Sequence, residues 1–149
     1  MSTPGIDDAR VGSWLEEHAD LTPPLVFVRV GEGQSNLTFR VDDAAGRSLI
    51  LRRPPLGEIL ASAHDVGREY RVLAGLSAAG LRVPMPIALC DDHDVTGAPF
   101  YAMEHVAGEV LSKVETAERL SPEARGLVGV GLARPRCRQR ARGGRAFSL

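Results

Sequence analysis

Two glycines, Gly31 and Gly33, separate two runs of residues that favour β-strands, and this pattern constrains the fold more than any other. The runs rich in β-branched and apolar residues are 25–30, 37–42 and 47–53. Residues 43–46 (Asp-Ala-Ala-Gly) have the composition of a hairpin turn, and Pro54 ends the third run. The first half of the chain therefore predicts three strands joined in antiparallel order.

A helix with an apolar stripe follows at residues 62–79. Ser62 and Asp65 resemble a capping box at its start, and Gly80 is a natural stop. The other predicted elements are a short amphipathic helix at 7–18 (Val11, Trp14, Leu15 and His18 on one face), strands at 83–90 and 99–106, a turn at 91–94 and a helix that starts at 121–123. This order indicates an α+β fold: a five-stranded antiparallel sheet with one main packed helix and a short N-terminal helix.

The chain has an uneven charge distribution. Residues 125–149 contain seven arginines and no acid, whereas all 19 acidic residues lie before them. This segment lacks sustained apolar periodicity, so we expect it to be largely disordered.

Several classes of protein are disfavoured. No apolar run approaches the roughly 18 residues of a membrane-spanning helix, and the N-terminus lacks the pattern of an export signal. Cys90 and Cys137 are far apart without metal-ligand spacing, so a metal site or a disulfide framework is unexpected. These features favour a cytoplasmic protein without a membrane partner.

The glycine turn could bind an anion. Gly31 and Gly33 let backbone amides approach phosphate oxygens, and Ser35 and Asn36 add side-chain donors. Residues 39–41 continue as a strand where a Rossmann fold would begin a helix, and no Gly-Lys-Ser/Thr follows as in a Walker A loop. A simple hairpin turn without a ligand is the alternative.

Two arginines end the third strand. Because side chains alternate between the faces of a sheet, Arg52 shares a face with Ile50 whereas Arg53 points the other way. Only one of them can enter a given cleft. The alternative is that both are solvated on an edge strand.

Glu69 is the natural partner for Arg52. It lies three residues after Val66 and four before Leu73, within the apolar stripe of the long helix. A carboxylate there needs a counter-charge, because burial of an unpaired charge is costly. Pairing with a neighbouring arginine of the same helix is the alternative.

Together these features resemble the N-terminal lobe of the aminoglycoside phosphotransferase family, whose fold is similar to that of protein kinases. The resemblance covers about residues 7–124. Residues 31–39 look like the nucleotide loop, with Asn36 where a kinase has its third glycine. Arg52 looks like the phosphate-facing base, and Glu69 like the helix carboxylate that orients it. The segment Leu51-Arg52-Arg53-Pro54-Pro55 looks closest to the related domains fused to acyl-CoA dehydrogenases.

Residues 99–108 look like the last strand and the hinge between lobes. The resemblance implies that Met103 lines the adenine pocket and that the backbone of Glu104 and Val106 binds the adenine edge. The nucleotide-binding residues that it implies are Gly31, Gly33, Gln34, Ser35, Asn36, Arg52, Glu69, Met103, Glu104 and Val106. The implied organisation is a helix and linker (1–24), an N-lobe (25–108), the start of a second lobe (109–125) and an arginine-rich tail (126–149).

The sequence departs from the family after residue 110, where the catalytic base and the magnesium ligands are expected. ATP and Mg²⁺ are the implied cofactors, and a small-molecule hydroxyl is the implied acceptor. Transfer needs a base and magnesium ligands, but residues 111–149 contain no histidine, asparagine or aspartate. We therefore expect a truncated, inactive chain, with no catalytic residue and no metal ligand of its own. A shifted reading frame near Gly126 is our hypothesis for the tail.

Three functions remain open from the sequence. The first is an ATP-dependent phosphotransferase that acts on a small molecule, and the second is a non-catalytic fragment that binds nucleotide weakly. The third, which we consider less favoured, is nucleic-acid binding through the basic tail, where Phe147 is the one aromatic residue available for stacking.

Overall fold

The computed structural model describes residues 4–31, 36–55, 65–108, 114 and 118–133. Five strands form one antiparallel sheet, as the sequence predicts, in the order β1-β2-β3-β5-β4. The strands are β1 (Val26–Arg29), β2 (Leu37–Asp42), β3 (Ser48–Arg53), β4 (Pro86–Cys90) and β5 (Phe100–Glu104). β3 therefore lies at the centre of the sheet, between β2 and β5.

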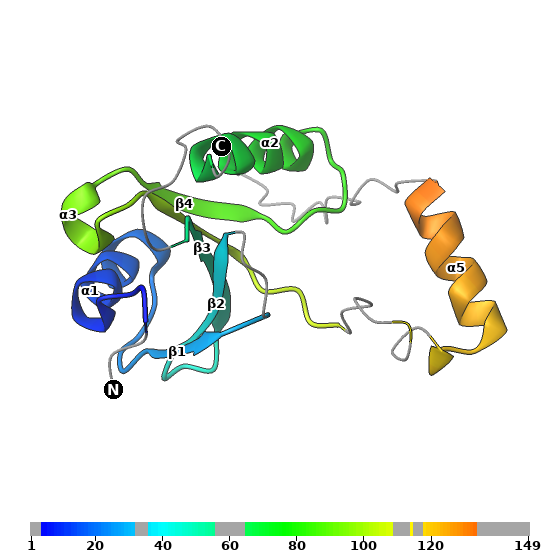
Figure 1. Cartoon of the computed structure of the whole chain (residues 1–149), viewed down its shortest axis with the longest axis horizontal. Coiled ribbons are helices and arrows are strands. Elements are labelled where there is room, and N and C mark those ends of the chain that lie inside the picture. Colours follow the sequence, from blue (N-terminus) through cyan, green and yellow to red (C-terminus); the bar gives the residue numbers. More distant parts are fainter. Residues whose placement is uncertain (1–3, 32–35, 56–64, 109–113, 115–117, 134–149) are drawn as a thin grey trace, which may run out of the picture.

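Helices lie on both faces of the sheet (Figure 1). The helices are α1 (Asp8–Ala19), α2 (Val66–Ala78), α3 (His93–Thr96) and α5 (Pro122–Ala133). The core cluster places α1 against one face, and α2 contacts β4 and β5 on the other. The α+β class is confirmed.

The main core lies between α1 and the sheet. Val11 and Leu15 of α1 are fully buried with Phe39, Val41 and Leu51 from alternate positions of β2 and β3. This alternation is the expected signature of strands that bury one face. The short N-terminal helix therefore covers most of the apolar interior.

The far end of the predicted α1 face is not buried. Trp14 is half-buried, and His18 is exposed and stacks on its ring with the two centroids 4.3 Å apart. The Trp14 ring also meets Phe100 edge-on at 5.0 Å. The apolar stripe of α1 ends instead with Ala19, which is buried.

The long helix α2 begins later than predicted. Its first residue is Val66, and its N-cap is Asp65, whose carboxylate accepts a hydrogen bond from the Arg68 N–H at 2.8 Å. The predicted capping residue Ser62 lies outside the described residues. Aspartate is as effective an N-cap as serine, which explains why the helix can start at this position.

The connection between β4 and β5 also differs from the prediction. Instead of a simple turn, Asp92 caps the short helix α3 by accepting a hydrogen bond from the Asp94 N–H at 2.8 Å. Gly97 ends α3 with a φ of +77°, a left-handed conformation that glycine adopts without strain.

The structure corrects the prediction for the start of the C-terminal segment. Residues that we expected to be disordered belong to α5, which runs from Pro122 to Ala133 and lies apart from the sheet (Figure 1). The Ser121 hydroxyl accepts a hydrogen bond from the Ala124 N–H at 3.2 Å, and proline suits the first turn of a helix. Residues 134–149 lie outside the described part of the chain. No described helix is long and apolar enough to cross a membrane.

Candidate functional site

The candidate site lies on the face of the sheet opposite α1. In the strand pairing, Arg52 of β3 lies between Thr38 of β2 and Tyr101 of β5. One step along, Ile50 pairs with Met103. Because cross-strand partners share a face, Arg52, Tyr101 and Met103 project to the same side.

Glu69 of α2 points at this row and binds three donors. Arg52 donates from Nε to Oε2 at 3.1 Å and from Nη2 to Oε1 at 3.4 Å. Tyr101 donates its hydroxyl to Oε2 at 3.0 Å, and Asn36 donates its amide to Oε1 at 2.7 Å. The predicted contact between Arg52 and Glu69 is therefore present, and two further donors complete it.

The ion pair is partly open to solvent. The side chains of Arg52 and Glu69 are 29% and 36% exposed. Surface ion pairs of this exposure are individually weak, so the two neutral donors matter for the geometry. An exposed guanidinium beside a fixed carboxylate can still reach an incoming anion.

Tyr101 is the most deeply buried member of the site. It is 2% exposed, and burial together with the charge of Glu69 raises the pKa of its hydroxyl far above the ordinary value. The hydroxyl therefore stays protonated and serves as a donor across the physiological range. Its ring meets Tyr70 of α2 edge-on, with centroids 5.9 Å apart.

Asn36 connects the glycine turn to this carboxylate. It is 8% exposed, and its side-chain oxygen is a buried atom without a hydrogen-bond partner among the described residues. The sequence interpretation gave its side chain to phosphate, whereas the structure directs its amide to Glu69.

The glycine turn itself is described only at its edges. Gly31 has a φ of +83°, and nothing lies within 4 Å of the position that a Cβ would take. The predicted ligands Gly33, Gln34 and Ser35 lie outside the described residues. Gly31 lies two residues after the end of β1, and glycine adopts this left-handed conformation without strain.

The predicted hinge residues lie beside the same face. Met103 is half-buried, and Val106 is 57% exposed. The Glu104 N–H donates to the Met85 carbonyl at 2.8 Å, while the Glu104 carboxylate accepts from the Met85 N–H at 3.2 Å. The amide of Glu104 is thus committed to the sheet, and a role at the adenine edge would belong to its carbonyl oxygen.

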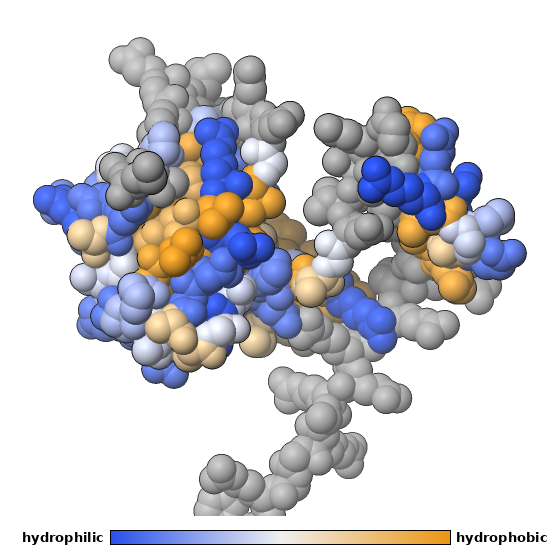
Figure 2. Space-filling model, turned by 90° about the horizontal axis from the view of Figure 1, so that it is seen from below, coloured by the Kyte–Doolittle hydropathy of each residue, from blue (hydrophilic) through white to orange (hydrophobic). Residues whose placement is uncertain are grey.

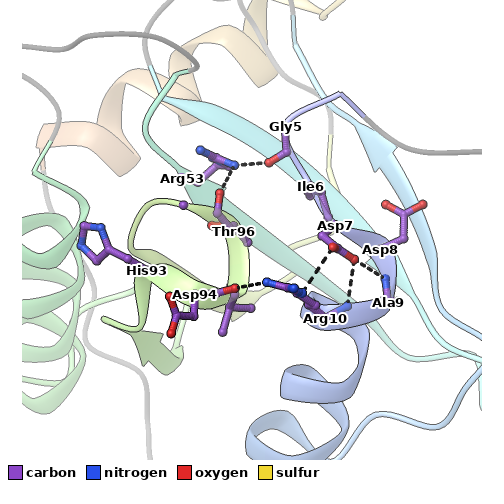
Figure 3. Close-up of a pocket in the computed structure, with 12 residues that line it drawn as sticks. Gly5, Ile6, Asp7, Asp8, Ala9, Arg10, Arg53, His93, Asp94 and Thr96 are labelled. Atoms are coloured by element: carbon purple, nitrogen blue, oxygen red, sulfur yellow. Dashed lines mark hydrogen bonds and ion pairs between the residues drawn. The ribbon is translucent and has the colours of Figure 1, made fainter.

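Arg53 has a different environment on the opposite face of the sheet. It is 4% exposed, and its guanidinium donates to the carbonyls of Gly5 and Thr96 (Figure 3) and to that of Pro54. Burial lowers its pKa from the ordinary arginine value. By linking the N-terminal segment, β3 and α3, Arg53 acts as a structural cross-link.

A cavity of about 890 Å³ lies beside Arg53, between the start of α1 and α3. Arg10 spans it by donating to the Asp94 carbonyl at 2.7 Å, and Asp7 caps α1 at its edge (Figure 3). The hydrogen bonds of Asp7, Arg10 and Arg53 at this cavity are made to groups of the protein itself. The cavity is separate from the face that carries Glu69.

The sequence interpretation missed Tyr101 as a member of the site. The available signal was its position two residues before Met103, which places both side chains on one face of a strand. No group of three histidine, cysteine, aspartate or glutamate side chains suited to a metal ion occurs in the described ranges.

Comparisons with known proteins extend these observations. The model of the "Phosphotransferase enzyme family" matches residues 26–145. Among curated proteins, the chain is 36% identical to acyl-CoA dehydrogenase family member 10 of Mus musculus over 117 residues, covering 78% of this chain and 11% of the relative. It is 33% identical to family member 11 of Homo sapiens, covering 83% of this chain and 16% of the relative.

A solved structure also matches. It is the crystal structure of a protein from Ralstonia eutropha assigned to the aminoglycoside phosphotransferases, with a TM-score of 0.58 and 33% identity. The match covers 80% of this chain and 33% of that protein. The chain thus spans about a third of the solved structure and less than a fifth of the acyl-CoA dehydrogenase relatives.

Proposed function

Because the chain belongs to the phosphotransferase enzyme family, we propose that it binds ATP on the sheet face that carries Arg52 and Glu69, as the nucleotide-holding part of a small-molecule kinase. The observation that carries this proposal is the ion pair between Arg52 Nε and Glu69 Oε2 at 3.1 Å. In phosphoryl transfer, catalysis depends on positioning and on compensating the charge of the phosphates.

Arg52 would hold the phosphates. Its guanidinium is planar and permanently charged, so it can form paired hydrogen bonds with phosphate oxygens. Glu69 fixes its direction from α2, and Val30, directly before Gly31, bonds to Thr38, the β2 neighbour of Arg52. Backbone amides of Gly31, Gly33, Gln34 and Ser35 would complete the phosphate site.

The adenine of ATP would lie further along the same face of the sheet. Met103 pairs with Ile50, two residues before Arg52 on β3, so it lies on the same face as Arg52 and nearer the hinge. There it would contact adenine, and the Val106 backbone with the Glu104 carbonyl would bind the adenine edge. This arrangement separates the apolar base from the charged phosphates.

We expect this chain alone to bind nucleotide without transferring phosphate. Residues 111–149 offer Glu115, Glu118 and Glu123 as their only acids and contain no histidine. Glu118 and Glu123 are exposed. The acceptor hydroxyl and the magnesium chemistry would require residues beyond those that form this sheet.

The experiment is calorimetric titration of the full 149-residue chain with ATP. We expect binding that weakens at least tenfold in Arg52→Gln and stays unchanged in the control Arg68→Gln, since Arg68 is exposed on the same helix as Glu69. A chain that releases no binding heat, or an Arg52→Gln variant that binds as tightly as the parent, would contradict the proposal. Phosphate transfer by the parent chain would contradict its inactivity.

A further inference from the structure

The cavity beside Arg53 has no role in the proposed function. It measures about 890 Å³, which is the size of a site for a small organic molecule. Apolar residues are also exposed along β1 (Figure 2), but the valines there carry no group that selects a ligand. The cavity does carry such a group, because the guanidinium of the buried Arg53 lies in its wall.

Arg53 has more hydrogen-bond donors than partners. An arginine side chain has five N–H groups. Nε donates to the Pro54 carbonyl at 3.1 Å, and Nη1 donates to the carbonyls of Gly5 and Thr96. The N–H groups of Nη2 therefore have no partner among the described residues. Nη2 is not one of the fully enclosed side-chain atoms that lack a partner, so a molecule in the cavity can reach it.

The charge of Arg53 is also uncompensated. Its acceptors are neutral carbonyls, and no described acid lies within ion-pair distance of it. A buried charge without a counter-ion is costly. Asp7 bonds to the start of α1 and lies 3.6 Å from Arg10, so this acid is already paired. Figure 3 shows the carboxylates of Asp8 and Asp94 turned away from Arg53.

We propose that this cavity binds a small molecule with one carboxylate group, which pairs with Nη2 of Arg53. A carboxylate fits because its charge offsets that of the guanidinium and its oxygens accept from the free N–H groups. A doubly charged anion fits less well, because acids line the same cavity and repel a second negative charge. These acids are Asp7, Asp8 and Asp94.

The wall of the cavity also suits a short apolar chain. Ile6, Ala9 and Val95 border it. Ile6 belongs to the core cluster, and Val95 packs against that cluster, so both are held in place. A short aliphatic carboxylate would therefore place its charged end at Arg53 and its chain against these side chains.

The experiment is an NMR titration of the full 149-residue chain with sodium butyrate, at an ionic strength held constant with sodium chloride. The backbone amide signals of Gly5, Thr96 and Gly97 should shift and saturate, since these residues line the cavity. Butyramide has the same chain without the charge and should cause no such shift. Sulfate, a doubly charged anion, should bind at least about tenfold more weakly than butyrate.

Two variants test the assignment to Arg53. Arg53→Lys keeps the charge but has no second terminal nitrogen, so we expect butyrate to bind at least about tenfold more weakly. Ala9→Phe places a ring at the exposed start of α1, where it fills the cavity, and should have the same effect. It provides a second arm in case Arg53→Lys does not fold. Ala78→Phe, at the exposed end of α2, is the matched control and should bind butyrate like the parent.

Several results would overturn this inference. Butyrate shifts that do not saturate, or that fall on the Arg52 face of the sheet instead of the cavity, would do so. Equal binding of butyramide would show that the cavity does not select the charge, and unchanged butyrate affinity in Ala9→Phe would exclude the cavity as the site. None of these results affects the proposed function, because Arg53 and Arg52 lie on opposite faces of the sheet.

Discussion

Replacing Glu69 by alanine should destabilise the fold more than its partial exposure suggests. The substitution leaves the buried donors of Tyr101 and Asn36 without an acceptor. Each buried donor left unsatisfied costs about 1–3 kcal/mol. The pair with Arg52, about a third exposed, adds at most about 1 kcal/mol. We therefore expect the free energy of unfolding to fall by about 2–7 kcal/mol.

Urea unfolding followed by circular dichroism measures this change. Glu69→Gln should lose roughly half as much, because its one oxygen can satisfy only one of the two neutral donors. Arg68→Ala on the exposed side of the same helix is the control, and it should stay within about 0.5 kcal/mol of the parent. A loss of less than about 1 kcal/mol in Glu69→Ala would show that the two donors find water instead, and would refute the reasoning.

Three further predictions concern the fold. Leu15→Ala should lower the free energy of unfolding by about 2–5 kcal/mol, since the side chain is fully buried between α1 and the sheet. A loss below about 1 kcal/mol in urea unfolding would show that α1 does not pack in the core. Gly46→Ala should cost about 1–2 kcal/mol because its φ is +82°, whereas Gly75→Ala within α2 should gain up to about 1 kcal/mol, and thermal melts that show the same sign for both would contradict this. Burial alone would raise the pKa of Asp43, but backbone N–H groups, those of Arg47 and Thr22 first, hold it below the ordinary 3.8. Asp43 therefore stabilises the fold above that pH and loses its effect as the pH falls through the lower folded value, so urea midpoints of Asp43→Asn should depend less on pH in the acid range.

Much of the fold could be predicted because apolar and polar residues alternate along the strands. The bounds of β2 match the prediction, since Phe39 and Val41 alternate with polar residues and the hairpin turn fixes the next strand. The family resemblance is confirmed by the match over residues 26–145 and by the solved structure. The start of α2 and the extent of α5 were missed, because capping and helix propensity are weak local signals beside apolar periodicity.

Some contacts of the candidate site could likewise be predicted from the sequence, and others could not. The contact between Arg52 and Glu69 could be predicted because each residue's facing follows from the period of its own element. The role of Tyr101 could not, since it depends on the pairing of β3 with β5, two strands separated in the chain by α2, β4 and α3. The contact of Asn36 with Glu69 of α2 could not be predicted either, because it depends on tertiary packing. The predicted roles of Gly33, Gln34 and Ser35 stay predictions.

The two adjacent arginines at the end of β3 also protect the molecule against misassembly. If this strand paired one residue out of step with its neighbours, each guanidinium would exchange sides. Arg53 would lose its carbonyl acceptors, and Arg52 would leave Glu69 and enter the apolar core without a partner. The two arginines therefore favour the observed strand register, because a slip by one residue would bury an unpaired charge.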